Sequence, residues 1–77
     1  MNYYKQKAMV LREILELLKR LEKKEEKIEL LPFLASYELK YGFSIKMLIK
    51  YIKFWIDVGI LNAEIKDDYI VFIKKQK

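Results

Sequence analysis

The sequence predicts a mainly α-helical fold with one small antiparallel β-hairpin (α+β), and three observations lead to it. Apolar residues recur with helical spacing in two long stretches of the chain. Gly42 and Gly59 each follow a helical run, where a left-handed residue commonly ends a helix. Two short strand-like runs come after Gly59. The 77 residues therefore make one domain, with a long first helix in 1–26, two helices in 28–58, a hairpin in 60–73 and a basic tail in 74–77.

The first helix carries one clear apolar face. Leu11, Ile14, Leu18 and Leu21 recur at i, i+3, i+7 and i+10. Met9, Val10 and Leu17 fall beside this stripe. Either they widen the face that packs on the core, or they form a second apolar surface that joins two chains in a dimer.

The second helix opens at Pro32, which fits a first helical turn because its missing N–H has no partner there in any case. Gly42 ends it. The preceding segment, Lys27–Leu30, alternates polar and apolar residues. It is either a short strand that pairs with the hairpin or the approach to the helix.

The third helix spans Ile45 to Val58. Ser44 is a suitable N-cap, and Phe43 and Leu48 stand at the two positions of a hydrophobic staple. Gly59 then allows a Schellman-type ending. Beyond it, the alternating runs 60–65 and 69–73 flank a polar turn made of Lys66, Asp67 and Asp68.

The composition argues against an enzyme. The chain has no cysteine and no histidine, so it lacks thiolate chemistry, the commonest general base and the commonest metal ligand. It also has no glycine-rich phosphate loop and no nucleophile motif. We therefore expect no catalytic residue, metal, cofactor or small-molecule ligand. Apolar runs are too short for a membrane span and no signal peptide is evident, which favours a cytoplasmic protein.

Basic residues form a strip on the third helix. Lys46, Lys50, Lys53 and Asp57 fall within about 60° of one another on a helical wheel. Every other position of that helix is apolar or aromatic. Residues 1–39 carry eight basic and seven acidic groups, a net charge of +1, whereas 40–77 carry eight basic and four acidic groups, a net charge of +4. The positive charge of the chain is thus concentrated in its second half.

This strip has two interpretations. Any helix of a lysine-rich protein needs a solvated face, which would be lysine here. Alternatively, the lysines contact a polyanion, and the uneven charge favours that interpretation. The second half of the chain has no arginine, so phosphate contact is better supported than base readout. For DNA we expect contacts from Lys40, Lys46, Lys50 and Lys53, with Ser44, Lys46 and Tyr51 nearest to base edges.

Three segments resemble the winged helix-turn-helix family, especially small stand-alone regulators of archaea and their viruses. They are Leu34–Ala35, the turn Tyr41–Ser44, and the helix ending Trp55–Leu61. The resemblance implies DNA binding through the third helix, with Lys46, Lys50 and Lys53 as contacts, and a dimer joined by terminal helices. The Lys- and Glu-rich composition with few Asn and Gln agrees with a thermophilic source. The acidic turn at Asp67 and Asp68 departs from the family, whose wing is usually basic.

These patterns predict a transcriptional regulator that binds double-stranded DNA as a homodimer. We expect it in the cytoplasm, associated with the nucleoid, or in the host cytoplasm if the protein is viral. The alternative is a winged-helix module that binds another protein in a replication, segregation or transcription assembly. Met47, Tyr51 and Phe54, which flank the lysine strip, would then form the contact surface.

Overall fold

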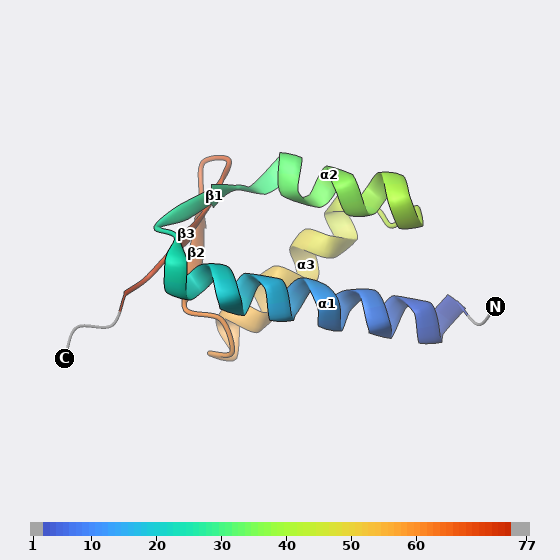
Figure 1. The fold of residues 1–77 in the computed structure, drawn as a ribbon, viewed down its shortest axis with the longest axis horizontal. Coiled ribbons are helices and arrows are strands. Elements are labelled where there is room, and N and C mark those ends of the chain that lie inside the picture. Colours follow the sequence, from blue (N-terminus) through green and yellow to red (C-terminus); the bar gives the residue numbers. More distant parts are fainter. Residues whose placement is uncertain (1–2, 75–77) are drawn as a thin grey trace.

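The computed structural model describes residues 3–74, with side chains from residue 6 onward. It contains three helices and a three-stranded sheet (Figure 1). In chain order the elements are α1 (Tyr3–Lys24), β1 (Lys27–Glu29), α2 (Leu30–Tyr41), α3 (Ile45–Asp57), β2 (Ala63–Lys66) and β3 (Tyr69–Phe72). The predicted α+β class is confirmed, and the arrangement is compatible with a winged-helix-like fold. Lys75, Gln76 and Lys77 of the predicted tail lie outside the described residues.

The sheet is antiparallel and has the strand order β1-β3-β2. The segment after α1 is therefore a strand, and its residue Ile28 is paired with Ile70 of β3. The Leu30 N–H donates to the Asp68 carbonyl over 2.9 Å, which ties the hairpin turn to the start of α2. The sheet thus closes one end of the molecule, where β1 links α1 to α2 (Figure 1).

The first hairpin strand begins later than predicted. Residues from Ile60 were expected in it, but β2 starts at Ala63. The Ile60 and Leu61 N–H groups both donate to the Trp55 carbonyl, over 2.9 and 3.1 Å. Because these groups complete the end of α3, they are not available to a neighbouring strand.

The core face of α1 is centred on Val10, Ile14 and Leu18, while Leu11 and Leu21 pack at its sides. Val10 is 3% exposed, so placing it with Met9 and Leu17 on a dimer surface was wrong for this residue. Its spacing of four from Ile14 brings it onto the same side of the helix. The remaining buried core residues come from the other elements: Leu30, Leu34, Phe43, Leu48, Ile52, Trp55, Leu61, Ala63, Ile70 and Phe72.

The turn between α2 and α3 follows the predicted chemistry. Gly42 has φ 76° and donates its N–H to the Glu38 carbonyl over 2.8 Å. The Ser44 Oγ accepts a hydrogen bond from the Met47 N–H at 3.3 Å, and Phe43 is buried in the core together with Leu48. Local side chains therefore set the direction in which α3 leaves the turn.

The start of α2 and the end of α3 also have local causes. Helix α2 begins at Leu30, two residues before Pro32, which still lies within the first turn, where the missing N–H costs nothing. Helix α3 ends as a Schellman motif: Gly59, with φ 84°, donates to Ile56 over 3.1 Å, and Ile60 donates to Trp55.

Glu22 anchors the end of α1 to the segment between α3 and β2. Its Oε1 accepts the Asn62 N–H at 2.8 Å, and its Oε2 lies 3.3 Å from the Lys19 Nζ. The same Nζ donates to the Ile60 carbonyl at 2.9 Å, and the Lys74 ammonium donates to the Glu22 carbonyl. These bonds hold α1 beside α3, a role for Glu22 that sequence periodicity did not reveal.

Candidate nucleic-acid interface

Three lysines form an exposed strip along α3, and we call Lys46, Lys50 and Lys53 the lysine face. The opposite side of the helix, with Leu48, Ile52 and Trp55, is buried. Within residues 6–74, none of the three ammonium groups forms an ion pair or a hydrogen bond. Asp57 lies on the same strip one turn beyond Lys53 and is exposed, yet its carboxylate does not form an ion pair with the Lys53 ammonium. The lysine face therefore presents uncompensated positive charge to solvent.

Ser44 and Lys40 lie near the N-terminal end of this strip. Ser44 is exposed, and its hydroxyl can still donate a hydrogen bond while its oxygen caps α3. Lys40 is exposed in the last turn of α2, with its Nζ 5.2 Å from the centre of the Tyr41 ring. Neither side chain is buried against another part of the described chain.

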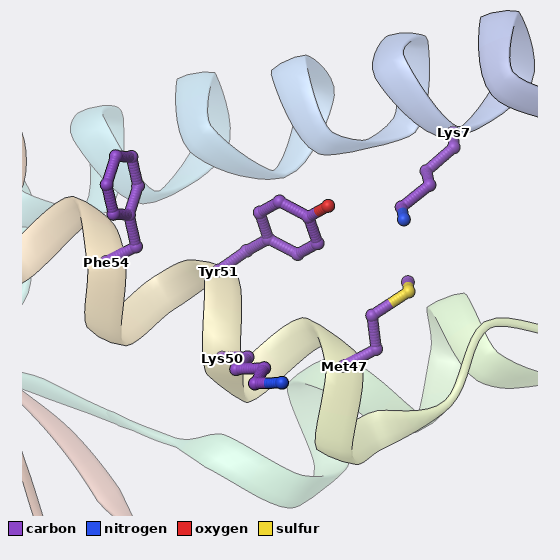
Figure 2. Close-up of a pocket in the computed structure, with 5 residues that line it drawn as sticks. All are labelled: Lys7, Met47, Lys50, Tyr51 and Phe54. Atoms are coloured by element: carbon purple, nitrogen blue, oxygen red, sulfur yellow. The ribbon is translucent and has the colours of Figure 1, made fainter.

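Tyr51 does not share the lysine face. Its ring points toward α1, where the Lys7 Nζ lies 5.2 Å from the ring centre (Figure 2). The ring also packs at a tilt against Trp55, with centroids 6.5 Å apart. Tyr51 is therefore placed to line the space between two helices, and its prediction as a base-edge contact has no support from this geometry.

A groove runs between α1 and α3 beside the lysine face. It consists of two pockets lined by both helices, the larger about 480 Å³, and a third pocket that adjoins them on α3 alone. Figure 2 shows the largest pocket, with Met47, Tyr51 and Phe54 on α3 and Lys7 reaching in from α1. The three α3 residues were predicted as a possible contact surface. The contributions of α1, from Lys7, Leu11, Arg12 and Leu15, were missed because they require knowing which face of α1 meets α3.

The remaining predicted dimer residues have different environments. Met9 is 66% exposed, and Leu17 is partly buried. Both lie on α1, outside the set of residues that line the groove. Of the three predicted contacts, Met9 and Leu17 therefore stay accessible to a second chain.

The hairpin turn is held by the backbone. Asp67 adopts a left-handed conformation with φ 55°, and the Asp68 carbonyl accepts the bond from Leu30. Both residues are exposed, and within the described residues neither carboxylate makes a hydrogen bond. The turn therefore presents two solvated negative charges, which are unfavourable next to a phosphate backbone.

An aromatic ladder leads along α2 to the turn before α3. Phe33, Tyr37, Tyr41 and Phe43 follow one another with ring centroids 5.6, 6.3 and 6.0 Å apart. Partial burial, followed by the nearby charge of Glu13 on α1, raises the pKa of Tyr37 above its ordinary value of 10.0. The Tyr37 ring is therefore neutral at physiological pH, and the ladder packs α2 against the turn from which α3 starts.

Among the described residues, no group of three or more Asp, Glu, His or Cys side chains converges in a way that could hold a metal ion. No helix among them is long and apolar enough to cross a membrane. Comparison with known families, curated proteins and solved structures found no match for this chain.

Proposed function

We propose that this protein binds double-stranded DNA through the lysine face of α3 and acts as a transcriptional regulator. The observation that carries the proposal is the row of three exposed lysines, none of which is paired with a carboxylate in the described chain. An α-helix fits the major groove of DNA, and each ammonium that reaches a phosphate releases a condensed counterion. The regulatory role rests on the resemblance to small winged-helix regulators.

The chemistry of the side chains sets the kind of binding. Lysine presents a single mobile charge, whereas arginine forms the forked pairs that distinguish bases. We therefore propose contacts that are mainly to phosphate, from Lys46, Lys50 and Lys53, with Lys40 and Ser44 at the N-terminal edge. The acidic turn at Asp67 and Asp68 stays off the DNA in this proposal.

A salt titration of DNA binding tests the proposal. With three phosphate contacts from each chain, the slope of log K against log salt concentration should be about −3 per bound chain. Reversing all three charges, with Lys46→Glu, Lys50→Glu and Lys53→Glu, should reduce affinity by at least about a hundredfold. Equal binding by parent and triple variant would contradict it.

The matched control reverses three exposed charges of α1, with Arg20→Glu, Lys23→Glu and Lys24→Glu. Both triple variants lower the net charge of +5 by the same amount. If the lysine face is the contact, the control should keep most of the DNA affinity. Circular dichroism should confirm that both variants keep the fold of the parent.

The proposal includes a homodimer in which Met9 and Leu17 of α1 contact the second chain. The high exposure of Met9 supports this, since a large apolar side chain gains by leaving water. Light scattering should give the mass of a dimer for the parent and a lower mass for Met9→Ser.

A role as a protein-interaction module is the second candidate. The groove between α1 and α3 favours this role, because its lining includes apolar side chains that a bound partner would remove from water. In that case Phe54→Ser would weaken a protein complex. DNA binding by the parent would be weak and independent of salt, and the lysine-face variants would not change it.

A further inference from the structure

The apolar floor of the groove has the spacing of a helix-binding surface. Met47, Tyr51 and Phe54, which line the groove, follow one another along α3 at intervals of four and three residues, and Val58, just after the helix, continues this spacing. This spacing keeps side chains on one side of a helix and is the pattern that packs against a partner helix. Phe54 is 56% exposed and Val58 is exposed as well, whereas Met47 and Tyr51 are partly buried, so α1 leaves the C-terminal half of this strip uncovered.

The rim of the groove is uniformly basic. The charged residues that line its three pockets are Lys7 and Arg12 from α1, and Lys46 and Lys50 from α3. No acidic residue lines any of the three. Arg12, Lys46 and Lys50 form no ion pair with the described part of the chain. An occupant with carboxylates along both sides would find cations on both helices.

We propose that this groove receives an acidic amphipathic helix from another protein. The apolar side of that helix would pack on Met47, Tyr51 and Phe54, and its flanking carboxylates would face the basic rim. The rim argues against a second copy of the chain as the occupant. Two such grooves face to face would bring their basic residues together, which electrostatic repulsion disfavours.

The position of the groove has a regulatory consequence, which rests on the proposed DNA binding. Lys46 and Lys50 belong both to the lysine face and to the pockets of the groove. Carboxylates that bind these ammonium groups neutralise the charge that DNA would use. The acidic helix and DNA should therefore compete for α3.

Designed peptides of about 16 residues, long enough for four helical turns, test the binding. One peptide carries leucines at the spacing of the apolar strip with glutamates beside them. The other has the same leucines and lysines in place of the glutamates. We expect the acidic peptide to bind at least about tenfold more tightly than the basic one, with an affinity that falls as salt is added.

The protein contains its own reporters of where the peptide binds. Trp55 is the single tryptophan and lines the groove, so its fluorescence should change on binding. The Met47 methyl group lies in the groove, whereas Met9 lies outside it. In methyl NMR spectra the Met47 signal should shift and the Met9 signal should stay in place.

A pair of surface variants separates the groove from general apolar contact. Phe54→Ser removes an apolar anchor of the groove, and Leu39→Ser removes an 86% exposed apolar side chain of α2 that does not line it. Both sites are exposed, so both variants should keep the fold, which thermal unfolding checks. We expect Phe54→Ser to weaken acidic-peptide binding by about tenfold or more and Leu39→Ser to leave it unchanged.

Three results would overturn the proposal: equal binding of the two peptides, no binding of the acidic peptide, or a parent dimer that Phe54→Ser converts to a monomer. The last would assign the groove to a second copy. Competition is measured by adding the acidic peptide to a complex with labelled DNA. If the parent binds the peptide but no DNA, the proposed function fails while the groove assignment stands. If both bind together, only the competition is wrong.

Discussion

Helices α1 and α3 lie side by side and bury their apolar faces in the same core, but their exposed faces differ in charge. Along its middle, the exposed face of α1 interleaves bases and acids, with Arg12, Glu13, Glu16 and Arg20 all exposed, before Lys23 and Lys24 in the last turn. That of α3 carries three lysines before its single acid, Asp57. Both helices belong to the same lysine-rich chain, so composition alone does not produce an all-lysine strip.

This difference indicates what each exposed face is suited to. Between Arg12 and Arg20 the exposed bases and acids of α1 cancel in pairs, so this stretch creates little net field. Three like charges along one side of α3 add together and attract a polyanion. The comparison therefore supports the proposed interface more strongly than the total charge of +5 does.

The buried faces of α1 and α3 should contribute similarly to the stability of the fold. Ile14 on α1 is 1% exposed and Ile52 on α3 is 0% exposed. Truncating either one, as Ile14→Ala or Ile52→Ala, should lower the free energy of unfolding by about 2–5 kcal/mol, because each leaves a cavity in the shared core. Urea denaturation measures both. If either variant does not fold, the Ile→Val pair should show matching losses of about 1 kcal/mol. Clearly unequal losses would mean that the core closes around the cavity more completely at one helix than at the other.

Single charge reversals on the exposed faces of α3 and α1 should have different effects on DNA affinity. Lys50→Glu imposes on α3 the alternation seen on α1, and we expect about tenfold weaker DNA binding with a salt slope reduced by about 1. Arg20→Glu makes the same change in net charge on α1 and should alter affinity by no more than about twofold. Fluorescence anisotropy with labelled duplex DNA gives both values. Similar losses in the two variants would remove the distinction between the helices.

The cap of α3 should contribute to stability where another serine does not. Ser44→Ala removes the acceptor for the Met47 N–H and should cost about 1 kcal/mol. Ser36→Ala is the matched control: its hydroxyl donates to the Phe33 carbonyl within α2, and alanine is the better helix former there. In thermal unfolding, the midpoint temperature of Ser44→Ala should be lower than that of the parent, and the midpoint of Ser36→Ala should be equal or higher. The reverse order would show that the cap bond does not define the start of α3.

Asp57 provides the smallest expected effect. Asp57→Asn removes the acid from the strip and should tighten DNA binding about two- to threefold at low salt. Glu16→Gln changes the net charge equally on α1 and should leave affinity unchanged. An unaltered affinity in Asp57→Asn would place the last turn of α3 outside the DNA contact and restrict it to the earlier turns.

Local signals allowed much of this fold to be predicted. Gly42, Ser44 and Gly59 each act on backbone groups within a few residues, and all three end or begin helices as expected. Val10 was misplaced because an i, i+3, i+7 stripe does not show how far around the helix the core extends. The start of the hairpin was also misplaced, because the completion of α3 takes up the N–H groups of Ile60 and Leu61.

The sequence by itself determined the class of fold, the turn that joins α2 to α3, the glycine that ends α3 and the alignment of Lys46, Lys50 and Lys53, because helical period and capping act over one or two turns. Only the tertiary structure decided that β1 pairs with β3, that Glu22 holds α1 in place, and that Lys7 and Tyr51 meet across a basic groove. These contacts join segments about 40 residues apart, and their geometry depends on how the whole core packs.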